Sequence, residues 1–103
     1  MQTTHYRPRV SLREIFPDGR IFGSRDIQVS SCSDDLRRCR DGGLFVALDT
    51  ADYDGHVLAD EAVRRGAGAV LAERCLPVGV PVCVGPDSRE AYGRLCQQLA
   101  GEP

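Results

Sequence analysis

Blocks of apolar residues alternate with polar stretches along the chain, and their lengths predict a small fold of mixed strands and helices. Residues 44–48 form a continuous apolar run of strand length, which is typical of a strand covered on both faces. A helix is predicted at about 57–65, and residues 67–72 form a second apolar strand. A strand, a helix and a strand within this short span predict a right-handed βαβ unit with parallel strands.

The amino-terminal segments predict shorter elements. Residues 1–10 are polar and are expected to form a flexible leader, without the apolar core of a signal peptide. The sequence Ser-Leu-Arg-Glu at 11–14 matches a capping box and predicts the start of a short helix, which the Pro-Asp-Gly turn at 17–19 ends. Residues 20–23 predict a short strand. The alternation around 27–29 predicts a half-buried strand that runs toward Cys32.

The carboxyl-terminal part predicts one more strand and one more helix. Residues 80–84 are a third apolar strand, and Asp87 followed by Glu90 predicts a capped helix start. One face of that helix carries Tyr92, Leu95, Cys96 and Leu99. The fold class predicted for residues 11–103 is therefore α/β: a small three-layer sandwich with a short, mostly parallel sheet and flanking helices.

Composition narrows the classes of function. The 103 residues carry a net charge of -2, which argues against a nucleic-acid-binding domain, and no apolar run is long enough to span a membrane. All 13 basic residues are arginines, so both a P-loop lysine and Schiff-base chemistry are excluded. The 5 cysteines contain no C-x-x-C and are odd in number, which favours reduced thiols in a cytoplasmic protein. A redox or metal pair of Cys32 and Cys39, which flank one loop, stays open as an alternative.

Two polar loops carry the candidate chemistry. Residues 33–43 precede the 44–48 strand and residues 49–56 follow it. Ligands of open α/β sheets bind outside the carboxyl ends of the strands. The second loop follows the 44–48 strand and must lie at its carboxyl end. The first loop lies there too if it folds back beside the strand.

These loops resemble the N-terminal domain of Mur ligases. Residues 32–48 read C-S-D-D-L-R-R-C-R-D-G-G-L-F-V-A-L and are followed by D-G-H at 54–56. The family pattern is close to T-x-D-S-R-x-V-x-x-G-D-L-F-V-A-L, followed by G-x-x-x-D-G-H. The stretches 62–73 and 87–92 are also similar to the family, so that the resemblance covers roughly residues 11–103 and is closest to the MurE-like branch.

The resemblance implies a binding module of peptidoglycan biosynthesis. In the family this domain holds the UDP end of a UDP-MurNAc-peptide, while ATP and Mg are used by a following domain and the amino acid is held by a third, whether these act in cis or in trans. No cofactor, metal or catalytic residue is thus expected in this chain. Carried over by position, the substrate-binding residues are Asp34, Leu36, Arg37, Ala51, Asp52 and Tyr53. The chain departs from the family at Leu36, Gly43 and near Thr50.

Other interpretations remain open. The departures also fit a remnant or interaction domain that keeps the fold and has lost the ligand. An independent enzyme would have to use Asp34 or Asp35 with His56, but nothing in the sequence orders these groups. Asp35 and Arg37 could instead be a structural pair within the loop. The Asp-Gly-His sequence at 54–56 is more simply a turn that leads into a helix.

Overall fold

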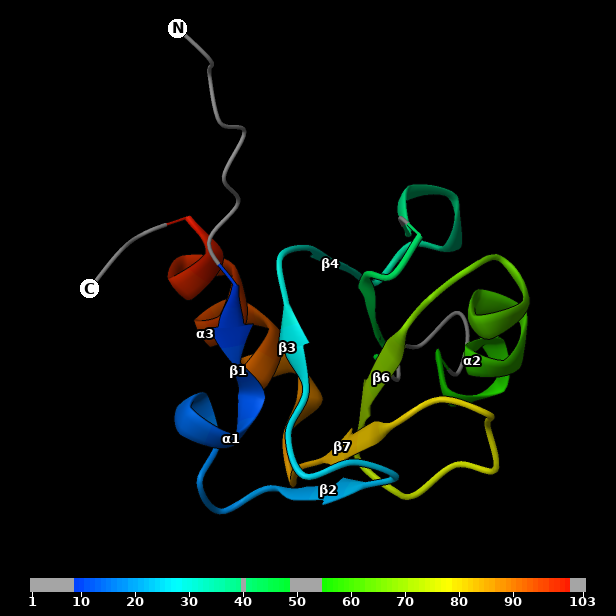
Figure 1. The fold of residues 1–103 in the computed structure, drawn as a ribbon. Coiled ribbons are helices and arrows are strands. Elements are labelled where there is room, and N and C mark those ends of the chain that lie inside the picture. Colours follow the sequence, from blue (N-terminus) through cyan, green and yellow to red (C-terminus); the bar gives the residue numbers. More distant parts are fainter. Residues whose placement is uncertain (1–8, 40, 49–54, 101–103) are drawn as a thin grey trace, which may run out of the picture.

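A five-stranded sheet forms the centre of the molecule (Figure 1), in a computed structural model that describes residues 9–39, 41–48 and 55–100. The strands follow the spatial order β2-β7-β6-β5-β4. Their bounds are β2 (Arg20–Phe22), β4 (Cys32–Ser33), β5 (Leu44–Val46), β6 (Ala69–Ala72) and β7 (Val82–Val84). Neighbours from β4 to β7 pair in parallel, and β2 pairs antiparallel with β7 at one edge. The mostly parallel sheet predicted from the sequence is confirmed.

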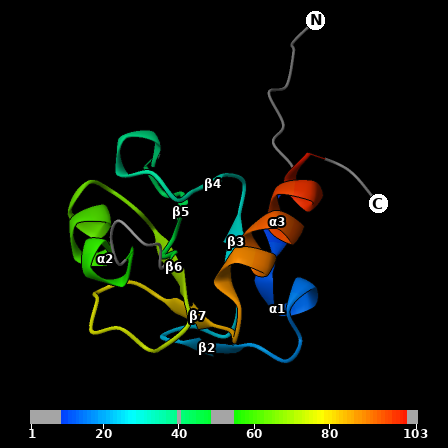
Figure 2. The same ribbon diagram turned by 180° about the vertical axis from the view of Figure 1, so that it is seen from behind.

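Helices cover both faces of this sheet. They are α1 (Leu12–Ile15), the 3-10 turn η1 (Leu36–Arg38), α2 (Gly55–Arg64) and α3 (Ser88–Leu99). A small antiparallel pair, β1 (Val10–Ser11) with β3 (Gln28–Val29), accompanies α1 and α3. Figures 1 and 2 show α2 on one side of the sheet and α1 with α3 on the other, which confirms the three-layer sandwich. Within the described ranges no helix is long and apolar enough to cross a membrane.

The central strands are apolar on both faces because both faces are covered. On β5, the alternate residues Leu44 and Val46 pack into the core cluster that includes Leu95 of α3. Phe45 between them packs into a second cluster with Ala59 of α2. All three β5 residues have no measurable exposure to solvent. The continuous apolar run is therefore the consequence of a parallel strand between two layers of helix, as predicted.

Three predicted helix ends are confirmed in detail. Ser11 caps α1 by accepting a hydrogen bond from the Glu14 N–H at 3.3 Å. Asp87 caps α3 by accepting one from the Glu90 N–H at 3.0 Å. Beyond α2, Gly66 has a φ of 112°, a left-handed conformation that a side chain would strain. These local signals stop and start the helices where the sequence places them.

Several boundaries differ from the sequence prediction for physical reasons. The strand predicted to run from 27–29 toward Cys32 is two strands, β3 and β4, that belong to different sheets. The segment 33–43, predicted to be a loop, contains the end of β4 and the turn η1. Helix α2 begins at Gly55, two residues early, because the Gly55 N–H donates directly to the Leu48 carbonyl at 2.7 Å. Val10, within the predicted leader, pairs with Val29.

Candidate functional site: a cleft between η1 and α2

The first candidate loop is a tight turn built by its own side chains. The Asp35 N–H donates to Ser33 Oγ at 3.0 Å, and Ser33 Oγ donates to the Asp35 carbonyl at 3.2 Å. The Asp35 carboxylate then caps η1 by accepting from the Arg37 N–H at 2.9 Å. Short polar side chains that bond to nearby backbone groups favour such turns over regular structure.

Asp35 and Arg37 also form an ion pair across this turn. The Arg37 Nε and Nη2 atoms donate to the two carboxylate oxygens of Asp35 at 3.3 and 3.2 Å. The hydrogen bonds from the Arg37 side chain, with that from its N–H, lower the pKa of Asp35, and the carboxylate raises the pKa of Arg37 in return. The structural pair considered from the sequence is thus present, while 86% of the Arg37 side chain stays exposed and accessible to an anion.

The turn faces helix α2 across an open cavity of about 440 Å³. Its lining residues are Asp34, Asp35, Leu36, Arg37, Leu58 and Arg65. Three of the six substrate-binding residues predicted by resemblance, namely Asp34, Leu36 and Arg37, are therefore brought together in one cleft. Leu36 and Leu58 also pack against the core cluster on the α2 side of the sheet, which fixes the apolar floor.

The topology explains why these elements meet at one edge of the sheet. Because β4 runs parallel to β5, η1 follows the carboxyl end of β4 just as residues 49–54 follow β5. The start of the first loop therefore lies at the carboxyl ends of the strands, where the sequence placed it if it folded back. Ala51, Asp52 and Tyr53, the other three predicted contacts, lie outside the described residues.

Leu58 and Arg65 are lining residues that the sequence did not single out. The two residues lie on α2 and just after it, seven positions apart, which is two turns of helix. That spacing places both residues on one face of the helix. It is the only feature of the sequence that relates the two residues to each other. It points to the cleft only once η1 is known to pack against α2.

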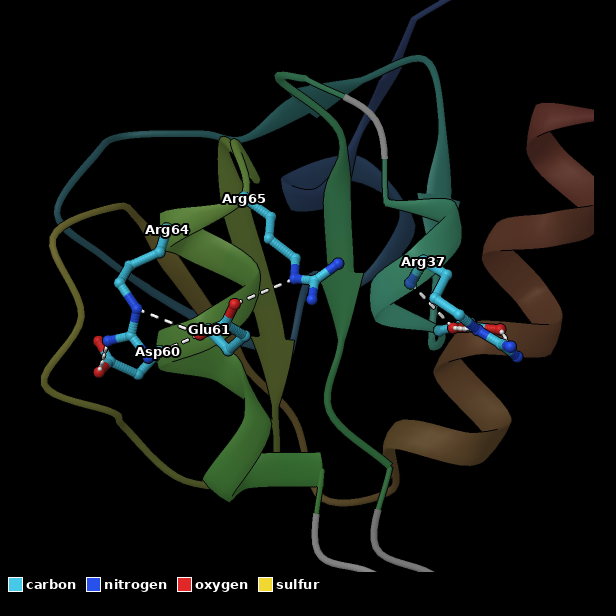
Figure 3. Close-up of polar contacts among 6 residues, drawn as sticks. Arg37, Asp60, Glu61, Arg64 and Arg65 are labelled. Atoms are coloured by element: carbon cyan, nitrogen blue, oxygen red, sulfur yellow. Dashed lines mark hydrogen bonds and ion pairs between the residues drawn. The ribbon is translucent and has the colours of Figure 1, made fainter.

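The end of α2 holds a second cluster of exposed charges. Figure 3 shows Arg64 paired with Asp60 and Glu61, and Arg65 paired with Glu61. Hydrogen bonds from Arg64 and then Arg65 lower the pKa of Glu61. Only Arg65 of these residues lines the cleft. Exposed ion pairs of this kind contribute little to stability, so exchanging one for a ligand anion costs little.

His56 has a structural place in the fold. It is buried in the first turn of α2, and its Nε2 accepts a hydrogen bond from the Glu73 N–H at 3.1 Å. The Glu73 carboxylate in turn accepts from the Ser88 N–H at 2.8 Å and from Ser88 Oγ at 2.9 Å. These bonds connect the starts of α2 and α3 to the residue after β6. Among the described residues no group of three or more metal-ligating side chains occurs.

Comparison of the sequence with known proteins finds relatives that are Mur ligases. The chain is 40% identical over 80 residues to the UDP-N-acetylmuramoyl-L-alanyl-D-glutamate--2,6-diaminopimelate ligase of Listeria innocua, covering 78% of the chain and 16% of that protein. It is 42% identical over 94 residues to the ligase of the same name from Halalkalibacterium halodurans, covering 91% of the chain and 19% of that protein. The chain thus spans less than a fifth of these curated relatives. No family model matches.

Solved structures give the same fold. MurF from Acinetobacter baumannii superposes with a TM-score of 0.74 at 21% identity, over 85% of this chain and 20% of that one. MurF ligase from Thermotoga maritima in complex with ADP gives a TM-score of 0.56 at 29% identity, over 65% of this chain and 16% of that one. The chain is therefore homologous to part of the Mur ligases. Together with its sequence relatives, the fold identifies it as a MurE-like Mur ligase N-terminal domain.

Proposed function

We propose that this chain holds the uridine diphosphate end of a UDP-MurNAc-peptide for an ATP-dependent ligase. The observation that carries the proposal is the cleft between η1 and α2. Its η1 wall follows the carboxyl end of β4, and ligands of this architecture bind outside the carboxyl ends of the strands. The identity of the ligand is inferred from the sequence relatives, which are named as ligases of UDP-N-acetylmuramoyl-L-alanyl-D-glutamate.

The cleft offers the two kinds of contact that a nucleotide diphosphate needs. Leu58 provides an apolar wall against which a flat pyrimidine can pack. Arg37 and Arg65 place two exposed guanidinium groups at the cleft, and guanidinium groups bind phosphate oxygens through charge-assisted hydrogen bonds. Each of these arginines would exchange a weak surface pair, with Asp35 or Glu61, for the ligand.

The residues present do not fit ATP or magnesium. The chain has no lysine and no G-K-[ST] loop, and its described residues include no cluster of metal-ligating side chains. In this proposal the domain contributes affinity and position, while acyl-phosphate formation and amide ligation belong to further domains that act with it. The chain by itself is a binding module.

The test is a titration of the chain with UDP-MurNAc-L-Ala-D-Glu, followed by amide chemical shifts, with UMP as the short control ligand. The proposal expects shifts in residues 33–39 and around the start of α2. Arg37→Ala is expected to weaken binding about tenfold, because one charge-assisted contact is removed. Arg64→Ala is the matched control, since Arg64 is an exposed, paired arginine of α2 that does not line the cleft.

Leu36→Ser is the sharper variant, because it restores the hydroxyl that the family pattern has at this position. We expect tighter binding by about 2- to 10-fold, the worth of one hydrogen bond. No shift at millimolar ligand, or equal effects of the Arg37 and Arg64 variants, would contradict the proposal. That result would favour the alternative of a non-catalytic remnant or interaction domain, for which the side chain of Leu36, packed against the core on the α2 side, is the specific observation.

A further inference from the structure

Two of the five thiols meet where α3 crosses the edge strand β4. Cys32 lies on β4, half-buried against the core cluster on the α3 side of the sheet. Cys96 lies on α3 with its residue exposed to solvent. The Cys96 thiol lies close enough to Cys32 to raise its pKa, although 63 residues of chain separate the two.

The juxtaposition follows from the backbone geometry as well as from the thiols. A neighbouring contact joins the same two elements. The Tyr92 hydroxyl on α3 donates to Oδ1 of Asp34, the residue after β4, at 3.5 Å. Tyr92 and Cys96 are four residues apart on a helix, a rise of about 6 Å. Cys32 and Asp34 are two residues apart on nearly extended chain, a span of about 6.6 Å. The two spacings match, so both pairs meet at once.

The electrostatic surroundings agree with this packing. Burial, then Cys96 and Asp34, raise the pKa of Cys32 to about 12. Burial, then Asp34, Cys96 and Cys32, raise the pKa of Tyr92 to about 12. The four side chains therefore form one cluster. An open cavity of about 500 Å³, lined by Cys32 and Tyr92 among others, gives solvent access to it.

We propose that Cys32 and Cys96 are a modification site, at which a disulfide oxidant such as glutathione disulfide joins β4 to α3 by an intramolecular disulfide. The exposed Cys96 reacts first: its thiolate attacks one sulfur of the oxidant, which releases one glutathione thiolate and leaves a mixed disulfide. Cys32 then loses its proton to solvent and attacks the Cys96 sulfur, which releases the second glutathione thiolate. Two protein thiols are oxidised by two electrons, and one glutathione disulfide is reduced to two glutathiones.

The second step is expected to be slow, because the thiolate and not the thiol is the nucleophile and Cys32 stays protonated near neutral pH. To form an S–S bond of about 2.05 Å the sulfur atoms must approach each other, and the exposed Cys96 side chain is the one free to rotate. The bond would fix the strand that leads into the cleft to a helix on the opposite face of the sheet. This inference does not depend on the proposed ligand.

The test is peptide mapping of the chain after incubation with glutathione disulfide and blocking of the remaining thiols with N-ethylmaleimide. Trypsin cleaves after arginine, so it releases Cys32 in residues 26–37 and Cys96 in residues 95–103, each without another cysteine. Cys39 falls in residues 39–40, and Cys75 and Cys83 share residues 75–89. The proposal expects the 26–37 peptide linked to the 95–103 peptide as the main disulfide product, and expects its loss on reduction.

Matched variants separate a folded-state pair from random oxidation. Cys96→Ser is expected to abolish the linked peptide, whereas Cys75→Ser, at another exposed cysteine, is expected to leave its yield unchanged. Oxidation in concentrated urea is expected to lower the yield severalfold, because the fold then no longer aligns the two thiols. Glutathione retained on Cys96 beside an alkylated Cys32, or Cys32 linked to Cys39, would overturn the proposal.

Discussion

Replacing Gly55 by alanine tests the packing that joins α2 to the end of β5. A Cβ atom at this position would lie closest to the Leu48 carbonyl oxygen, 2.5 Å from the Leu48 nitrogen and 2.9 Å from the Ala47 carbonyl carbon. All three atoms belong to the backbone of the segment that follows the central strand, so no side chain can rotate away. The first turn of α2 must move instead.

The magnitude combines a clash with a weakened hydrogen bond. Forcing an extra methyl into a packed site costs about 1–3 kcal/mol. Moving α2 also stretches the 2.7 Å bond from the Gly55 N–H to the Leu48 carbonyl, which adds about 0.5–1.5 kcal/mol. The higher helix propensity of alanine offsets up to about 1 kcal/mol. We expect a net loss of about 2–3 kcal/mol in the free energy of unfolding, which lowers Tm by about 8–24 °C in a domain of this size.

The assay is urea denaturation of Gly55→Ala beside Gly93→Ala, followed by circular dichroism. Gly93 is exposed within α3, and a Cβ there would meet nothing within 4 Å. The same chemical change is therefore expected to raise stability by up to about 1 kcal/mol at that site. The reasoning would be refuted if Gly55→Ala unfolded within about 0.5 kcal/mol of the unchanged chain, the range of an ordinary surface substitution.

Three further outcomes are expected. Leu95→Ala should lower the unfolding free energy by about 2–5 kcal/mol in urea denaturation, because the Leu95 side chain is fully buried on the α3 side of the sheet. Ser88→Ala should cost about 0.5–1.5 kcal/mol in the same assay, because the buried hydroxyl donates to Glu73 at 2.9 Å. Burial raises the pKa of Asp26, but hydrogen bonds from Ser11 and from backbone N–H groups outweigh it, and the folded pKa lies below the unfolded one. Its contribution is thus present above the unfolded pKa of about 3.9 and lost as the pH falls through the folded value, so Asp26→Asn should flatten the acid side of a stability–pH curve.

Local signals in the sequence predicted the elements that local interactions decide. The apolar run at 44–48 indicated a strand covered on both faces, and the caps at Ser11 and Asp87 placed two helix starts. The break between β3 and β4 was missed because only Ser30 and Ser31 separate the two pieces, and only their partners in space assign them to different sheets. Pairing partners are nonlocal, and no spacing along the chain specifies them.

The candidate site divides in the same way. The motif at residues 32–37 predicted the turn that lines the cleft, because its polar side chains bond within the turn. Leu58 and Arg65 complete the lining through tertiary packing of α2 against η1, which leaves only a helical spacing in the sequence. A family motif identifies site residues that lie within the motif. The residues on the opposite side of the cleft are brought there by tertiary packing.

The position of β7 in the sheet has a consequence for how the chain folds. β7 lies between β6, its parallel neighbour, and β2, which pairs with it through Arg20 and Val84 across 64 positions of chain. Closing so long a loop is entropically costly, and folds dominated by such contacts form slowly. On the ribosome, β2 emerges early and has no partner until residue 84 has been made. We therefore expect its edge to be exposed to chaperones or to wrong pairing until β7 has been made, and the sheet to close in a cooperative step after that.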